Sequence, residues 1–232
     1  MKVVILAGGK GTRISEYTKS IPKPMVKIGS KPIIEHIINY YIKFGFKEFI
    51  IASGYKQSII KNYFKKKSFP SVNIKVINTG SETLTGTRLK KLKYHLTETF
   101  MLTYGDGLSN VNLTKLLKFH KKKKKMITLT AVHPPARFGE LTIKDNLVNS
   151  FKEKPQLNRG WINGGFFVIE PDFLKHIGNR NVMLERSPIQ SVVKKKQLSA
   201  YEHKDFWFCM DTLRDKKVLE NLLKQNEAPW LM

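Results

Sequence analysis

The stretch KVVILAGGKGTR, at residues 2–13, decides the fold expected for this chain. Its apolar run 3–7 indicates a buried strand, because a strand covered on both faces shows no polar alternation. The glycines Gly8, Gly9 and Gly11 favour a turn whose backbone N–H groups can approach a phosphate closely. Such a turn is equally compatible with a purely structural role, and it fits neither G-x-G-x-x-G nor G-x-x-x-x-G-K-[ST]. The stretch therefore predicts a candidate phosphate loop and argues against a dinucleotide-dependent dehydrogenase.

Apolar runs alternate with amphipathic stretches beyond this turn, as in βαβ units around a mostly parallel sheet. Ser30 and Pro32 supply helix-start chemistry, and Gly45 supplies a stop, for a helix over 31–44. Further strands are expected over 48–52, 73–78, 99–104 and 126–133, and further helices over 57–64, 87–96 and 113–121.

The second half has a different sequence pattern, in which glycine and proline interrupt short predicted strands up to residue 169. Helices are expected near 171–177 and 188–196, and Thr212 is a candidate cap for a closing helix over 213–224. We therefore predict an α/β fold: a Rossmann-like, mostly parallel sheet flanked by helices, with a small β-rich lobe, all within a single domain.

An acidic turn, Gly105-Asp106-Gly107, follows the strand expected over 99–104. Ligands of open α/β sheets gather at the carboxyl ends of the strands. We therefore expect the loops 8–13 and 105–107 to line the same crevice.

The charge balance raises the question of nucleic-acid binding, because 42 Lys and Arg against 18 Asp and Glu give a net charge of +24. Only seven of the 42 are arginine, the residue better suited to bidentate recognition. Lysine runs at 65–67, 121–125 and 194–196 fall at expected helix ends, where cations suit the helix dipole. We predict a solvated basic surface and no nucleic-acid partner, with a nucleic-acid-binding protein as the remote alternative.

The single cysteine, Cys209, excludes an internal disulfide and fits a reducing compartment, so a cytoplasmic location is expected. It is more simply a buried packing thiol than a nucleophile. No apolar run is long enough to predict a membrane helix, and no membrane partner is expected.

Several further motifs occur in a fixed order along the whole chain. These motifs are Pro22-Lys23-Pro24-Met25, Lys31-Pro32, Thr85-Gly86-Thr87-Arg88, Tyr104-Gly105-Asp106-Gly107, Arg137-Phe138-Gly139, Glu153-Lys154-Pro155, Asn163-Gly164-Gly165-Phe166-Phe167 and Met210-Asp211-Thr212-Leu213-Arg214-Asp215. Together with the loop at 8–13, they make the sequence resemble the sugar-phosphate nucleotidyltransferases, and within that family the glucose-1-phosphate cytidylyltransferases.

The resemblance implies a GT-A-like nucleotidyltransferase fold, with about 1–132 as the nucleotide-binding half and about 133–232 as the acceptor-binding half. It implies transfer of CMP from CTP to a sugar 1-phosphate, with α-D-glucose 1-phosphate expected first, by direct in-line displacement of pyrophosphate. The CDP-sugar product would serve polysaccharide synthesis. No protein nucleophile is needed, and positioning and charge neutralisation carry the catalysis.

Residue roles are implied in the same way. Arg13 neutralises the triphosphate and the developing pyrophosphate, and Lys23 reaches the transferring phosphoryl group. The nucleotide-binding residues are expected to be Leu6, Ala7, Gly8, Gly9, Gly11, Thr12, Arg13, Lys23, Arg88, Tyr104, Gly105 and Asp106.

Asp106 and Asp211 are the carboxylates that the resemblance assigns to Mg²⁺, a hard cation that usually takes one or two protein carboxylates plus substrate phosphates. The alternative for each is a turn or cap aspartate. On the acceptor side the expected residues are Gly139, Glu153, Lys154, Asn163 and Gly164. For the pair Glu153 and Lys154, the alternative is a surface ion pair.

One segment departs from the cytidylyltransferase pattern. Those enzymes carry a longer excursion between the helix that ends here near Phe64 and the segment at Thr79-Gly80, and here only residues 65–78 join them. That excursion is associated with subunit packing and with the edge of the active site. A homo-oligomer, a different phosphomonoester acceptor and a different nucleoside triphosphate therefore stay open.

Overall fold

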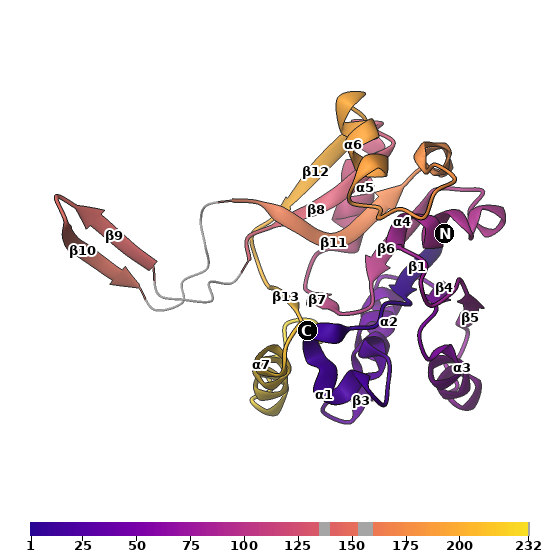
Figure 1. Cartoon of the computed structure of the whole chain (residues 1–232), viewed down its shortest axis with the longest axis horizontal. Helices are drawn as coiled ribbons and strands as arrows, with labels where there is room; N and C mark the ends of the chain where they lie inside the picture. The colour runs from indigo at the N-terminus through magenta and orange to yellow at the C-terminus, as the bar shows by residue number, and fades with distance from the viewer. Residues whose placement is uncertain (135–139, 153–159, 232) are drawn as a thin grey trace.

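A seven-stranded sheet forms the centre of the molecule in the computed structural model, which describes residues 1–134, 140–152 and 160–231 (Figure 1). Its strand order is β12-β8-β11-β6-β1-β4-β5. Neighbouring strands run parallel except β11, which is antiparallel to both β6 and β8. The strands are β1 (Lys2–Ala7), β4 (Glu48–Ser53), β5 (Asn73–Asn78), β6 (Phe100–Tyr104), β8 (Ile127–Val132), β11 (Ile162–Ile169) and β12 (Leu198–His203). The predicted α/β, mostly parallel sheet is confirmed.

Each face of the sheet has its own hydrophobic core, because successive side chains of a strand point to opposite faces. In β1, Val3 and Ile5 belong to one core and Val4 and Leu6 to the other, which explains the unbroken apolar run in the sequence. Helices α2 (Ile33–Lys43), α3 (Gln57–Lys66), α5 (Leu113–Lys123) and α7 (Leu213–Lys224) contribute to the first core. Helices α4 (Thr85–Lys90), α6 (Ser187–Lys194) and the 3-10 helix η4 (Pro171–His176) contribute to the second.

Most helix boundaries agree with the sequence signals. Gly45 follows α2 with a φ of 83°, and Thr212 caps α7 through a capping box with Asp215. Ser30 makes no cap, because α2 begins after Pro32 without a side-chain cap. The single helix predicted over 87–96 is wrong: α4 is followed by a separate 3-10 helix, η3 (Lys93–His95).

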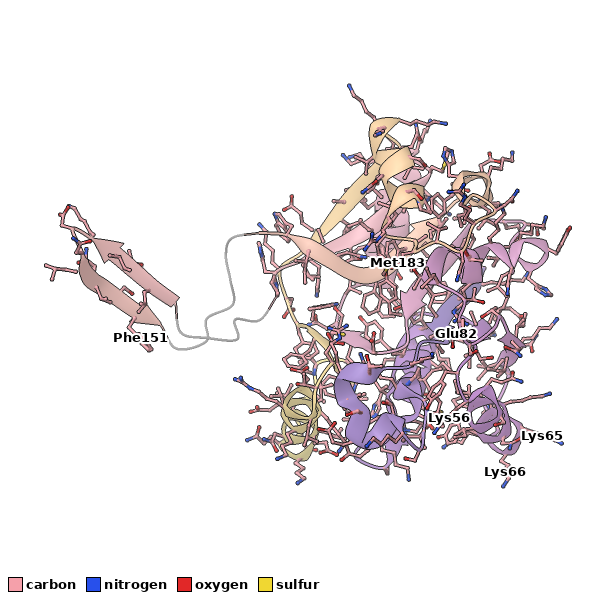
Figure 2. The ribbon with its side chains drawn as sticks, in the orientation of Figure 1. Lys56, Lys65, Lys66, Glu82, Phe151 and Met183 are labelled. Atoms are coloured by element: carbon pink, nitrogen blue, oxygen red, sulfur yellow. The ribbon has the colours of Figure 1, made fainter. Side chains whose placement is uncertain are left out.

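Three two-stranded sheets lie outside the central one: β2 (Lys27–Ile28) with β3 (Lys31–Pro32), β7 (Gly107–Ser109) with β13 (Trp207–Cys209), and β9 (Glu140–Lys144) with β10 (Leu147–Lys152). In Figure 1 the β9–β10 hairpin stands apart from the sheet, and Figure 2 labels Phe151 on it. The β7–β13 pair matters for the site, since it aligns Gly107 with Cys209.

The lysine runs lie at helix ends as predicted: α3, α5 and α6 end at Lys66, Lys123 and Lys194. Figure 2 shows Lys65 and Lys66 projecting outward from α3. In the described part of the chain, no helix combines the length and apolarity needed to cross a membrane.

Candidate active site

The loops after β1 and β6 lie side by side, because these two strands are parallel neighbours with Leu6 aligned to Tyr104. The Gly105 N–H donates to the Leu6 carbonyl oxygen at 3.1 Å. Together the loops border a cavity of about 490 Å³, which confirms the predicted common crevice. The cavity is lined by Leu6, Ala7, Gly8, Gly9, Gly11, Arg13, Lys23, Pro24, Thr83, Leu84, Thr85, Arg88, Thr103, Tyr104, Gly105, Asp106, Gly107, Asn163, Gly164, Gly165, Met183, Trp207, Cys209 and Asp211.

The glycine loop is packed against two cationic side chains. A Cβ at Gly8 would lie 1.9 Å from the Arg88 guanidinium, and one at Gly11, where φ is +63°, would lie 2.8 Å from the Lys23 Cβ. Both positions therefore require glycine. Gly11 precedes the short 3-10 helix η1 (Thr12–Ile14), from which Arg13 reaches the cavity, whereas Thr12 is exposed and is not among the lining residues.

Lys23 joins the two predicted metal-binding aspartates. It lies in the 3-10 helix η2 (Lys23–Met25), and its Nζ is 2.6 Å from Asp106 Oδ2 and 2.6 Å from Asp211 Oδ1. Arg13 Nη1 contacts the other oxygen of Asp211 at 2.7 Å. Residues separated by up to 198 positions thus form one charge cluster at the edge of the cavity.

Burial differs sharply within this cluster. The Lys23 side chain is 10% exposed, whereas that of Arg13 is 71% exposed. Burial by itself would lower the pKa of Lys23, but the attraction of Asp106 and the hydrogen bonds to both carboxylates outweigh it, and the pKa is raised. Lys23 is therefore a fixed positive charge at neutral pH, and Arg13 is a positive charge able to meet a ligand.

Asp211 does not cap α7, which was the alternative to a metal-binding role for this residue. The N-cap of α7 is Thr212, whose hydroxyl accepts from the Asp215 N–H at 3.2 Å, while Asp215 Oδ2 accepts from the N–H groups of Thr212 and Asp211. The carboxylate of Asp211 is thus directed to Lys23 and Arg13 rather than to the helix end.

The carboxylates of Asp106 and Asp211 fit a hard divalent cation. One oxygen of each already contacts the same ammonium, so the pair can share a single positive ion. One ligand atom from each and Cys209 Sγ lie within 4.8 Å of one another. Burial, with the nearby Asp106 charge, raises the pKa of Cys209, so the thiol stays protonated and leaves the hard-ion role to the oxygens.

Arg88 is buried, and four of its hydrogen bonds go to the protein. Its Nη1 donates to the Ser53 carbonyl at 2.7 Å and to the Thr79 hydroxyl, and its Nη2 donates to the carbonyls of Gly80 and Thr83 at 3.0 and 2.6 Å. The guanidinium also lies against Gly8. Arg88 therefore holds the loop 79–84 beside the glycine loop, which places the polar segment Thr83–Thr85 on the cavity wall.

Asn163 and Gly164 of β11 also line the cavity. Asn163 Oδ1 accepts from the Gly165 N–H at 2.9 Å, and its Nδ2 donates to the Tyr104 hydroxyl at 3.3 Å. The Gly164 carbonyl accepts from Trp207 Nε1 at 2.6 Å. A Cβ at Gly165, where φ is +77°, would lie 2.5 Å from the Tyr104 ring, so this turn in β11 requires glycine.

Three of the predicted acceptor-binding residues, Gly139, Glu153 and Lys154, lie outside the described residues. Sequence reasoning missed Thr83, Thr85 and Met183 as lining residues. Figure 2 labels Met183. Met183 could not be found from a short motif. Its segment reaches the site through hydrogen bonds that the N–H groups of Gly86 and Thr87 donate to the Val182 carbonyl, and these residues are distant in sequence.

Comparison with known proteins agrees with this geometry. The family model described as nucleotidyl transferase matches residues 2–215. The chain belongs to the nucleotidyl transferase family. It is 42% identical to the glucose-1-phosphate cytidylyltransferase of Salmonella typhimurium, over 99% of this chain and 98% of that protein. It is 34% identical to the D-glycero-alpha-D-manno-heptose 1-phosphate guanylyltransferase of Campylobacter jejuni, over 89% and 93% of the two chains.

Among solved structures, UDP-glucose pyrophosphorylase in complex with UDP-glucose matches with a TM-score of 0.75 at 17% identity, covering 97% of this chain and 98% of that one. This similarity concerns the fold, and it confirms the predicted GT-A-like nucleotidyltransferase architecture. The family membership confirms that the chain is a nucleotidyltransferase.

Proposed function

We propose that this chain transfers CMP from CTP to a sugar 1-phosphate, with α-D-glucose 1-phosphate as the first candidate, and releases pyrophosphate and a CDP-sugar. The observation that carries the proposal is the 42% identity, over 99% of the chain, to a glucose-1-phosphate cytidylyltransferase. The cavity supports it, because the glycine loop, two aspartates and a polar wall of β11 surround one space large enough for small ligands.

The proposed reaction is a single displacement. An oxygen of the acceptor phosphate attacks the α-phosphorus of CTP, the bond between that phosphorus and the α–β bridging oxygen breaks, and pyrophosphate leaves with the bonding electrons. The two anions repel each other, so the protein must hold them in line and offset their charge. We assign the triphosphate to the loop Gly8–Gly11 and Arg13, and the transferring phosphoryl group to Lys23.

A divalent cation completes the proposed site. Asp106 and Asp211 would hold it, and we take Mg²⁺ as the ion because both donors are carboxylate oxygens. When bound, such an ion neutralises phosphate charge and orients the triphosphate. We propose that Arg13 adds to this neutralisation of phosphate charge, because its exposed side chain lines the cavity and can contact a bound triphosphate.

The acceptor is proposed to bind on the side of β11. Asn163 and Gly164 line this wall, and we keep Gly139, Glu153 and Lys154 as proposed acceptor residues with them. The nucleotide then lies against residues of about 1–132 and the acceptor against residues of about 133–232, within a single domain over 1–232. A cytoplasmic location is proposed, because the lone Cys209 fits a reducing compartment.

A second candidate keeps the chemistry and changes both substrates. The 34% identity to a heptose 1-phosphate guanylyltransferase favours GTP and a heptose 1-phosphate as the alternative pair. The lining residues alone do not decide between the pairs, because sugar and base discrimination depends on a few hydrogen bonds within a shared site.

A pyrophosphate-release screen tests both candidates. The four common ribonucleoside triphosphates and dTTP are each combined with glucose 1-phosphate, its epimers, a heptose 1-phosphate and non-sugar phosphomonoesters, with Mg²⁺. Release with CTP and glucose 1-phosphate well above every other pair supports the proposal. Preference for GTP with a heptose 1-phosphate supports the second candidate, and release with no pair contradicts both.

A further inference from the structure

A hydrogen-bonded chain runs from the acceptor wall of the cavity to a carboxylate behind it. The Tyr104 hydroxyl donates to Glu185 Oε1 and accepts from Asn163 Nδ2. Tyr104 and Asn163 line the cavity, whereas Glu185 is not among the lining residues and lies in the segment before α6. Glu185 can therefore influence a ligand only through the residues that it holds.

The order of donors in this chain is set at its two ends, by Glu185 and by the Gly165 N–H. An ionised carboxylate only accepts, so the single phenolic hydrogen of Tyr104 points to Glu185 and the phenolic oxygen must accept from Asn163. At the other end, the Gly165 N–H can only donate and takes Asn163 Oδ1 as its acceptor at 2.9 Å, which leaves Nδ2 to face Tyr104. Burial, with the adjacent Glu185, raises the pKa of Tyr104, which keeps the phenol protonated as this order requires.

Glu185 is itself held in place. Its Oε2 accepts from the Thr85 hydroxyl at 2.8 Å, and the same hydroxyl accepts from the Leu184 N–H at 2.8 Å. The Gly86 N–H donates to the Val182 carbonyl at 3.0 Å, so the segment 182–185 is tied along the start of α4. Both carboxylate oxygens therefore have partners, and the carboxylate position is defined from two elements.

We propose that Glu185 is a positioning residue for acceptor selection: by accepting the Tyr104 hydrogen, it leaves the phenolic oxygen free to accept from Asn163 Nδ2, and so holds the amide in the position in which it meets the sugar hydroxyls of the acceptor. This inference rests on the proposed function. One amide N–H of Asn163 is committed to Tyr104, and the other has no protein partner among the described residues. A sugar hydroxyl that accepts from this N–H is favoured over an epimer that places its hydroxyl elsewhere.

The substitution Glu185→Gln tests the inference, because glutamine has the same shape but can donate to the Tyr104 oxygen, which turns the phenolic hydrogen toward the donor Asn163 Nδ2 and breaks that hydrogen bond. We expect kcat/KM for glucose 1-phosphate to fall about tenfold, the cost of one misdirected hydrogen bond. The KM for CTP should stay within about twofold, and the preference for glucose 1-phosphate over its epimers should narrow. Glu202→Gln makes the same chemical change at an exposed carboxylate of β12 and should alter none of these values.

Tyr104→Phe separates positioning from a general structural role, because it removes the hydroxyl through which Glu185 acts. It should also narrow the epimer preference, and adding Glu185→Gln to Tyr104→Phe should change kcat/KM by less than about twofold further. An equal tenfold loss from Glu185→Gln in both backgrounds, or a matching rise in the KM for CTP caused by Glu185→Gln alone, would overturn the inference. If the Glu185→Gln variant does not fold, the Tyr104→Phe variant provides the test: an unchanged preference for glucose 1-phosphate over its epimers would overturn the inference. A wild-type chain that releases no pyrophosphate with any pair contradicts the proposed function itself.

Discussion

At the scale of single residues, the site depends on Lys23, an ammonium that occupies the space between two carboxylates. Its contacts to Asp106 and Asp211, 2.6 Å each, neutralise a pair that would otherwise repel. In the proposed function, Asp106 and Asp211 would hold a divalent ion that would offset their charge, and Lys23 would then be able to turn toward the phosphates of the nucleotide. We therefore expect the same side chain to stabilise the free site and to contact the phosphates of a bound nucleotide.

Asp106→Asn and Asp211→Asn should each lower kcat/KM by about 100-fold or more, because an amide cannot offset the charge of a metal ion as a carboxylate does. Steady-state kinetics over a range of Mg²⁺ concentrations should show a weaker apparent metal affinity in both variants. Each variant should keep a melting temperature near that of the wild type, since Thr212 caps α7 without Asp211. A folded variant with wild-type metal dependence would remove that aspartate from the metal site.

Lys154→Ala should damage use of the acceptor far more than binding of CTP, because we assign its ammonium to the acceptor phosphate. Loss of one charge-assisted contact corresponds to roughly 10- to 150-fold in kcat/KM for the acceptor. Titration of CTP with Mg²⁺ should give nearly the wild-type Kd. Weakened CTP binding with unchanged acceptor kinetics would move Lys154 to the nucleotide side, and no change in either would return it to a surface ion pair.

At the scale of elements, the C-terminal segment is fastened to α2 by a neutral histidine. His36 lies 3% exposed on α2, with Nε2 positioned to donate to the Ile28 carbonyl at 3.0 Å, while Nδ1 accepts from Trp230 Nε1 at 3.3 Å. Both ring nitrogens are satisfied only in the neutral form. Burial lowers the pKa of His36 from its ordinary value of 6.5, and the nearby Lys31 adds to this shift.

This geometry predicts a loss of stability in acid. In the unfolded chain, His36 takes up a proton near pH 6.5, whereas in the folded chain its pKa is lower. The free energy of unfolding therefore falls as the pH drops below about 6.5, and it continues to fall until the pH reaches the pKa of the folded state. Burial lowers the pKa of His203 as well, which adds in the same direction. Thermal melts between about pH 8 and 5.5 should show a decreasing melting temperature. His36→Gln should flatten this dependence, and an unchanged slope would assign it to other groups.

At the scale of the whole molecule, the two sequence halves share one sheet. Strand β11, from the second half, lies between β6 and β8 from the first half, and β12 extends the sheet beyond β8. The cavity likewise takes its lining from both halves. The halves are therefore interleaved, and neither can keep its sheet neighbours without the other.

We accordingly expect one cooperative unfolding transition for the chain. Calorimetry should give a van't Hoff enthalpy equal to the calorimetric enthalpy, and near-UV and far-UV circular dichroism should report the same midpoint. Added glucose 1-phosphate or CTP should raise the midpoint temperature of this single transition by the same amount for every probe. Two resolved transitions, only one of which responds to CTP, would show that the halves unfold as separate domains.

Local signals in the sequence were sufficient for the elements whose boundaries depend on local chemistry. The apolar run of β1, the Gly45 stop of α2 and the Thr212 cap of α7 were all predictable, because strand burial and helix capping depend on residues close together in sequence. The common crevice of the loops after β1 and β6 was also predictable, since parallel strands end at the same edge. The resemblance also assigned Asp106 and Asp211 to one metal ion, which stays a prediction, and the structure brings both carboxylates to Lys23.

Other features required the tertiary structure, because they depend on groups far apart in sequence. Pairing of β7 with β13 aligns Gly107 with Cys209, which places Asp106 and Asp211 beside Lys23, a meeting that no sequence spacing encodes. Arg88 carries a motif that predicts a ligand contact, which stays a prediction, and its hydrogen bonds to loop carbonyls show that it also supports the loop, which the motif does not encode. Glu185 carries no motif at all. Its place behind Tyr104 follows from packing of the segment before α6 along α4, and packing is a property of the whole fold.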